Sequence, residues 1–130
     1  MKQLYIIFLI LLTGFSLSAE GRFVTYKVGD SQYEGYYTGD KKSKALVILV
    51  HDWDGLTDYE VKRAEMLKKE GYAAFAIDLF GKGNRPTTTE AKQALTGALY
   101  GDRKKMRLLL DAGVTAAKKQ FGNSGSVIAA

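Results

Sequence analysis

The sequence predicts an α/β fold of three layers, in which helices cover both faces of a mostly parallel sheet and an antiparallel hairpin precedes them. Residues 22–28 alternate between apolar and polar, 33–38 form a second β-type segment, and the two flank a short turn, as is typical of a hairpin. Apolar runs at 45–50 and 72–77 are separated by one helical pattern, which is the order of a strand–helix–strand unit. The length of 130 residues allows a single domain.

Residues 1–19 have the pattern of a secretory signal peptide and are left out of the fold prediction. Lys2 supplies a positive charge, an unbroken apolar run covers 5–12, and small residues at 18–19 offer a cleavage site. The apolar run is short for a membrane span, so an uncleaved anchor is the weaker alternative. We predict an exported protein, periplasmic or extracellular. Residues 20–130 would form its mature domain, without stable membrane insertion once the signal is removed.

The two central strands and the helix between them are marked by residues with known structural preferences. The runs at 45–50 and 72–77 do not alternate, as expected for strands buried on both faces of a parallel sheet. Thr57 and Glu60 have the spacing of a capping box, and Gly71 stands where the helix would end. We therefore predict a buried strand, a crossover helix and a second buried strand.

Two further helices and the start of another strand follow. Thr87 and Glu90 repeat the capping-box spacing, and alanines and leucines recur at helical intervals over 91–99. A last helix is predicted over 102–119, and 126–130 has the composition of a buried strand. The predicted sheet therefore breaks off within a strand, which favours an incomplete domain.

Charge and cysteine content exclude several classes of function. The formal net charge is +5, but the basic residues alternate with acidic ones on the predicted helices, as at 62–65 and 68–70. We interpret them as solvated faces and predict no nucleic-acid partner. There is no cysteine, which excludes disulfides and thiolate metal sites.

The loop at 51–55, with the sequence HDWDG, lies at the carboxyl end of a predicted parallel strand, where open α/β sheets bind their ligands. One interpretation is a turn of helix-capping acids with Trp53 in the core. Another is a metal site. Its possible ligands are His51, Asp52, Asp54 and Asp58. A single histidine among carboxylates makes a weak site, and we predict no metal or cofactor.

A third interpretation rests on resemblance. The stretches VILVHDWDGL (47–56), RAEML (63–67) and GYAAFAIDLFG (71–81), together with YEGY (33–36), resemble the dienelactone hydrolase family in its order and spacing. The resemblance implies an α/β-hydrolase fold, of which this chain carries the N-terminal half. It also implies hydrolysis of carboxylic ester or enol-lactone bonds, like that of carboxymethylenebutenolidase, on a small-molecule substrate. A secreted, non-catalytic small-molecule-binding module and a flavodoxin-like cofactor-binding domain are the alternatives.

The resemblance implies roles for four residues. Asp52 stands where the family has an acidic residue that contacts the resting nucleophile, and the main-chain N–H of Trp53 would donate to the oxyanion hole. The side chains of Trp53 and His51 would border the substrate, with His51 orienting the loop rather than acting as the catalytic base. Arg85 lies in a loop that could reach a substrate carboxylate, and a solvent-exposed loop arginine is the alternative.

The nucleophile is not among the residues of the chain. The nearest match to the elbow G-x-C-x-G or G-x-S-x-G is GNSGS at 122–126, which lacks the last glycine and precedes a strand. We therefore interpret Ser124 as a loop serine. The resemblance implies that the elbow, with cysteine or serine, and the aspartate and histidine of the triad follow Ala130. We predict that this chain is inactive alone.

Overall fold

The computed structural model describes residues 20–122 and 125–130. The signal-peptide prediction for 1–19 and the interpretation of Ser124 lie outside the described residues. The elements follow one another as β1 (Arg22–Val28), β2 (Ser31–Thr38), β3 (Leu46–Val50), α1 (Asp58–Lys69), β4 (Ala73–Ile77), α2 (Thr89–Gly101), α3 (Arg103–Phe121) and β5 (Val127–Ala129). Each predicted strand and helix is present, with small shifts at its ends.

The strands form one sheet in the order β1-β2-β4-β3-β5. The pairs β1–β2 and β2–β4 are antiparallel, whereas β3 is parallel to both β4 and β5. Within the described sheet β2 alone therefore runs against the other strands. The predicted fold class, a mostly parallel sheet with an N-terminal hairpin, is confirmed. The predicted last strand lies beside β3, where Leu46 pairs with Val127 and Ile48 with Ala129.

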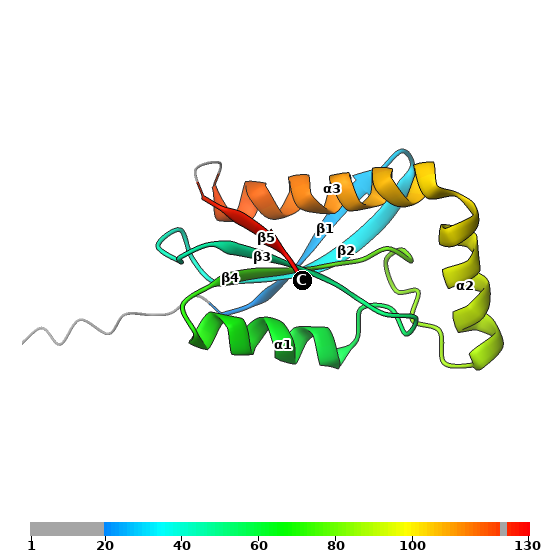
Figure 1. Ribbon diagram of the computed structural model, residues 1–130, viewed down its shortest axis with the longest axis horizontal. Coiled ribbons are helices and arrows are strands. Elements are labelled where there is room, and N and C mark those ends of the chain that lie inside the picture. The colour runs from blue at the N-terminus through cyan, green and yellow to red at the C-terminus, as the bar shows by residue number, and fades with distance from the viewer. Residues whose placement is uncertain (1–19, 123–124) are drawn as a thin grey trace, which may run out of the picture.

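Helices cover both faces of this sheet, as Figure 1 shows, with α3 on one face and α1 on the other. Successive residues of β4 alternate between the two sides: Phe75 and Ile77 belong to the core cluster under α3, and Ala74 and Ala76 to the cluster that contains Ala64 of α1. This alternation follows from the two-residue period of a strand. The third helix, α2, lies across the end of the sheet to which the carboxyl ends of β3 and β4 point (Figure 1).

The two capping predictions have different outcomes. At α1 the capping box is confirmed, because the Thr57 hydroxyl accepts from the main chain and the Glu60 carboxylate accepts from Thr57 N at 2.8 Å. At α2 the prediction of Thr87 is wrong: Thr88 is the N-cap and accepts from Ala91 N at 3.2 Å. Consecutive threonines make the spacing ambiguous, and a cap hydroxyl must reach a donor two or three residues on.

Helix α2 is held less tightly than the other helices. It has no buried residue, whereas the five buried residues of α3 are Leu109, Gly113, Ala116, Ala117 and Phe121. The apolar residues of α2 therefore cover the end of the sheet, and of them Leu99 packs against the core cluster. None of the helices in the described part of the chain is long and apolar enough to cross a membrane.

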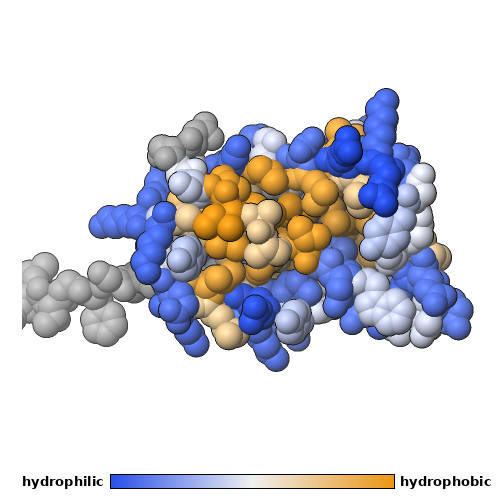
Figure 2. Space-filling view, in the orientation of Figure 1, coloured by the Kyte–Doolittle hydropathy of each residue, from blue (hydrophilic) through white to orange (hydrophobic). Residues whose placement is uncertain are grey.

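The edge strand β5 carries an apolar surface. Figure 2 shows a continuous hydrophobic area over this side of the sheet, between α1 and α3. The exposed large apolar residues of β3 and β5 are Val50, Val127 and Ile128, and Ile128 is 48% exposed. In the described residues the outer edge of β5 has no strand partner. An apolar edge of this kind is unusual for a finished sheet.

Candidate active site

A tight turn joins β3 to α1 at the carboxyl end of the parallel strands. Gly55 N donates to the Asp52 carbonyl oxygen at 3.3 Å, and Asp54 N donates to the Asp52 carboxylate at 2.9 Å. Gly55 has a φ of 81°, in the left-handed region, and a Cβ there would lie 3.0 Å from the Phe80 ring. Only glycine combines this conformation with this closeness at low cost. The turn lies where the sequence predicted it.

His51 fixes the turn to the next strand. It is buried, its Nε2 accepts from Leu79 N at 3.0 Å, and its Nδ1 lies 2.7 Å from the Asp52 carbonyl oxygen. Because Nε2 accepts, we assign the proton to Nδ1, which then donates to that carbonyl. Both ring nitrogens are therefore engaged by main-chain groups. This arrangement orients the loop and leaves no nitrogen to act as a general base.

The turn leaves main-chain donors unused, and the N–H of Trp53 is among them. Within the described residues, Trp53 N–H has no hydrogen-bond acceptor. The neighbouring Asp52 is exposed, and its carboxylate is directed back to Asp54 N. A fixed, unpaired N–H at the end of a strand can stabilise negative charge that develops on a bound carbonyl. Asp52 and Trp53 thus lie together, while the contact of Asp52 with a nucleophile stays a prediction.

A cavity of about 360 Å³ opens beside this turn. Its wall is mainly apolar and comes from β3 and its turn, the start of the loop after β4, α2 and α3. The lining residues are Val50, His51, Asp52, Trp53, Leu79, Phe80, Thr96, Leu99, Tyr100 and Met106. This volume lies at the lower end of small-molecule sites. The cavity therefore brings together three of the four predicted site residues.

The sequence did not single out Thr96, which contributes an unusual group to this wall. Its hydroxyl oxygen is buried and has no hydrogen-bond partner in the described structure. By contrast, the Thr115 hydroxyl on α3 donates to the Asp111 carbonyl at 2.8 Å, the usual arrangement for threonine within a helix. An unpaired buried hydroxyl in a cavity can bind a polar group of a ligand.

Lys92 is a second contributor that the sequence did not single out. Its ammonium group forms an ion pair with Asp54 and lies 5.1 Å from the centre of the Trp53 ring. In the sequence, α1, β4 and the loop after β4 lie between the turn and Lys92. No local pattern could therefore have indicated the contact, which depends on how α2 lies across the end of the sheet.

Arg85, the fourth predicted site residue, does not line this cavity. Its guanidinium group lies 3.4 Å from the carboxylate of Asp78, which is fully buried, and donates to Gly81 O at 3.2 Å. Its side chain is only 27% exposed, so it is not a freely solvated arginine either. It lines a separate cavity with Phe23 and Glu34. A role toward a substrate carboxylate stays a prediction.

The buried carboxylate beside Arg85 fixes the loop after β4. Asp78 accepts from Glu34 N, Phe80 N and Gly81 N, each at 3.0 Å. Its carbonyl oxygen also accepts from the Tyr26 hydroxyl at 3.1 Å. Burial, followed by the charge of Asp78, raises the pKa of that hydroxyl. Every group is paired, so we assign this cluster a structural role.

The metal interpretation gains no support from the geometry. No group of three or more histidine and carboxylate side chains placed to hold a metal is found in residues 20–122 and 125–130. His51, the central member of the proposed set, uses both ring nitrogens in hydrogen bonds to the main chain.

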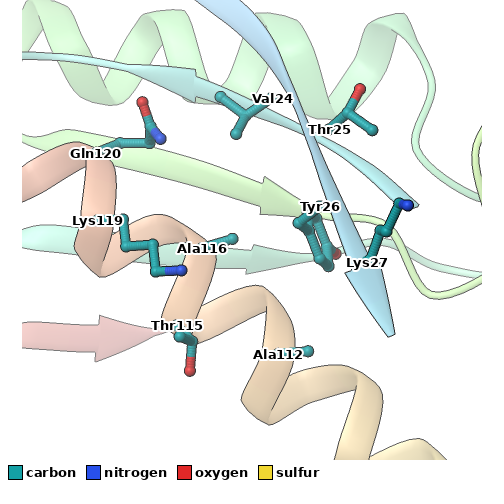
Figure 3. A pocket seen from close by; sticks show the side chains of 9 residues that line it. All are labelled: Val24, Thr25, Tyr26, Lys27, Ala112, Thr115, Ala116, Lys119 and Gln120. Atoms are coloured by element: carbon teal, nitrogen blue, oxygen red, sulfur yellow. The ribbon is translucent and has the colours of Figure 1, made fainter. Parts of the chain in front are cut away.

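Another cavity, of about 460 Å³, lies between β1 and α3 (Figure 3). Ala112 and Ala116 point from α3 toward β1, and their small side chains leave the space open. Val24 and Tyr26 of β1 line it from the other side. No residue of the turn after β3 or of the loop after β4 borders this cavity, and we do not assign it to the site.

Comparison with known proteins supplies the context for this geometry. The model of the dienelactone hydrolase family matches residues 33–129. The chain named m3DLH is 27% identical, with a TM-score of 0.77 over 85% of this chain and 48% of the other. P91, a dienelactone hydrolase-like promiscuous phosphotriesterase from metagenomic libraries, is 24% identical, with a TM-score of 0.76 over 85% and 47%. Esterase Pf2001 from Pyrococcus furiosus is 28% identical, with a TM-score of 0.53 over 85% and 41%. No curated protein matches significantly. This chain thus spans about half the length of the first two of these structures.

Proposed function

The chain belongs to the dienelactone hydrolase family, and we propose on that basis that it forms the oxyanion-stabilising half of an exported ester or lactone hydrolase. The complete protein would cleave a carboxylic ester or enol-lactone by acyl transfer to a nucleophile and then to water. The nucleophile, which is cysteine or serine, and the rest of the triad would come from a segment that this chain does not contain.

The unpaired N–H of Trp53 is the observation that carries the proposal. Attack on an ester carbonyl converts its oxygen into an oxyanion, and donors that already point at that oxygen lower the barrier. Trp53 N–H lies at the carboxyl end of a parallel strand, in a turn that His51 and Gly55 fix, and the cavity opens beside it. Asp52 would contact the resting nucleophile from the same turn.

The apolar edge of the sheet supports the idea of a longer protein. Val127 and Ile128 of β5 are exposed, although their apolar character suits strands with neighbours on both sides. The solved structures that resemble this chain are about twice as long as the part of them that it covers. A further segment that paired with β5 would cover this surface and would bring its own residues to the carboxyl end of β3.

The lining of the cavity supports a class of substrate. Its wall is mainly apolar, with one hydroxyl that is both buried and unpaired, that of Thr96. We expect a small, mainly apolar acyl group that carries one hydrogen-bonding substituent. Export to the periplasm or outside the cell follows from the signal-peptide prediction, so an extracytoplasmic ester or lactone is the proposed substrate.

The first test is the nucleotide sequence that follows codon 130. A G-x-C-x-G or G-x-S-x-G pattern within the next few codons, in frame or after a single shift, is the expected result. The extended protein should then hydrolyse p-nitrophenyl acetate, whereas the 130-residue chain should not. Turnover by this chain alone, lost in Asp52→Ala, would contradict the assignment of the nucleophile to another segment.

Two substitutions at one position then test the oxyanion donor in the extended protein. Trp53→Pro removes the N–H and should lower kcat about 10²- to 10³-fold, the usual effect of losing one oxyanion donor. Trp53→Ala keeps the N–H and removes only the ring, so it should raise KM and lower kcat much less than Trp53→Pro does. Equal losses of kcat in both variants would show that the N–H is not the group that matters.

A further inference from the structure

Lys92 lies at an unfavourable position for a cation. It belongs to the first turn of α2, where the positive end of the helix dipole opposes a positive charge. Its side chain is nevertheless largely covered, with 20% of it exposed. Its contacts offset this cost, since one ammonium group pairs with Asp54 and lies over the ring of Trp53. Because both contacts are made to the turn after β3, they indicate that Lys92 helps to position this turn.

This ammonium group connects α2 to the turn after β3. Helix α2 has no buried residue, and within the described structure the pair with Asp54 is the only ion pair that it makes. Asp54 and Trp53 are adjacent in the turn, and Asp54 N is bonded to Asp52. A shift of α2 would therefore displace Trp53 and Asp54 together. It would also displace the peptide group between Asp52 and Trp53, which carries the unpaired N–H.

We propose that Lys92 is a positioning residue that couples the placement of α2 over the cavity to the direction of Trp53 N–H. With the ion pair and ring contact made, the turn is fixed and the cavity is covered. When they are broken, α2 and the indole move apart and the N–H loses its fixed direction. The role of this coupling in catalysis rests on the proposed function. The coupling itself is a property of this chain and can be measured without substrate.

Trp53 is the only tryptophan of the chain, and this makes the test specific. We compare Lys92→Met, which keeps most of the length and removes the charge, with Lys92→Arg, which keeps a cation. Lys104→Met is the matched control, because Lys104 is exposed and lines a different cavity. The readouts are the amide cross-peak of Trp53 in an ¹⁵N–¹H NMR spectrum and acrylamide quenching of its fluorescence.

In Lys92→Met the Trp53 amide peak should shift or broaden and quenching should increase. The ratio of packed to released indole should fall about two- to fivefold, the usual effect of losing a cation–π contact at an exposed ring such as that of Trp53. Lys92→Arg should restore both signals, and Lys104→Met should leave them unchanged. If circular dichroism shows that Lys92→Met does not fold, Asp54→Asn, which removes the other partner of the pair, is analysed in the same way.

Identical Trp53 signals in Lys92→Met and Lys104→Met would overturn the coupling and leave the proposed function untouched. A shifted Trp53 amide peak in Lys92→Met would support the coupling. If the extended protein nevertheless showed no hydrolysis, the coupling would stand but would have no role in catalysis. The two failures are therefore distinguishable.

Discussion

Two loops leave the carboxyl ends of the neighbouring parallel strands β3 and β4, and they differ in whether their polar groups are paired within the protein. The loop after β4 begins at Asp78, whose carboxylate is fully buried and accepts from three main-chain N–H groups and Arg85. The turn after β3 begins at His51, which is also buried and satisfied, but the next two residues are exposed and Trp53 N–H is unpaired. In the loop after β4 the buried carboxylate is paired within the protein, whereas the turn after β3 leaves a main-chain donor unpaired beside the cavity.

The difference shows where this half-domain is specialised. Pairing every buried polar group stabilises a loop, whereas a donor without a protein partner adds no such stabilisation and can bind a ligand group. His51 connects the two, because its Nε2 accepts from Leu79 N in the β4 loop. The loop after β4 therefore supports the turn after β3, and substitutions in each should have different effects.

Removal of the buried carboxylate should produce the largest effect. Asp78→Ala leaves three N–H groups and the Arg85 charge without their partner, and we expect a loss of about 3–5 kcal/mol of unfolding free energy. Urea denaturation would measure it. Asp30→Ala, at an exposed turn, is the control and should change stability by less than about 0.5 kcal/mol. Equal stabilities of the two variants would remove the contrast between the loops.

Removal of the connecting histidine should have the next largest effect. His51→Ala leaves Leu79 N–H buried and unpaired, which should cost about 1–3 kcal/mol. The fluorescence of Trp53 should change as well, because the turn loses its anchor. Tyr59→Ala, which removes an exposed ring from α1, is the control for loss of aromatic area. If His51→Ala unfolded with the same free energy as the wild type, the turn after β3 would not depend on its contact with the loop after β4.

The features that could be predicted from the sequence are the local and periodic ones. The buried strands follow from apolar runs, and the cap at Thr57 follows from a spacing of three residues that one helical turn brings together. The turn at 51–55 could be placed at the carboxyl edge for the same reason, since it directly follows a strand. Its mainly apolar surroundings required the structure.

The missed features depend on contacts between distant segments. Whether Arg85 or Lys92 meets the turn is decided by the path of the loop after β4 and by the placement of α2, and neither has a periodic signal. Nothing in the sequence distinguishes Thr96 from Thr115, although one hydroxyl is unpaired and the other bonds a carbonyl. The role of Asp78 was missed because its donors come from two different segments.

Two glycine substitutions, one in the turn after β3 and one in α2, should change the free energy of unfolding in opposite directions. Gly55→Ala places a Cβ in the left-handed region and against Phe80, and should cost about 1–2 kcal/mol. Gly97→Ala in α2 meets open space and should add about 0.5–1 kcal/mol. Both are single-methyl changes, measured by urea denaturation. Changes of the same sign would show that the turn does not need its backbone conformation.

The smallest effect should come from the hydroxyl that supports the loop after β4 from β1. Tyr26→Phe removes one hydrogen bond to the Asp78 carbonyl and should cost about 1 kcal/mol.

Burial raises the pKa of Tyr26, so the folded state favours the neutral hydroxyl. Its contribution is therefore complete below the unfolded pKa of about 10 and is lost as the pH rises above it. The difference between wild type and Tyr26→Phe in urea denaturation should consequently stay constant up to about pH 10 and shrink above it. Other tyrosines titrate in both chains and cancel, and Tyr100→Phe, at an exposed position on α2, provides the control. A difference that stays constant with pH would mean that the hydroxyl is not bonded in the folded chain, and Asp78 would then fix its loop without help from β1.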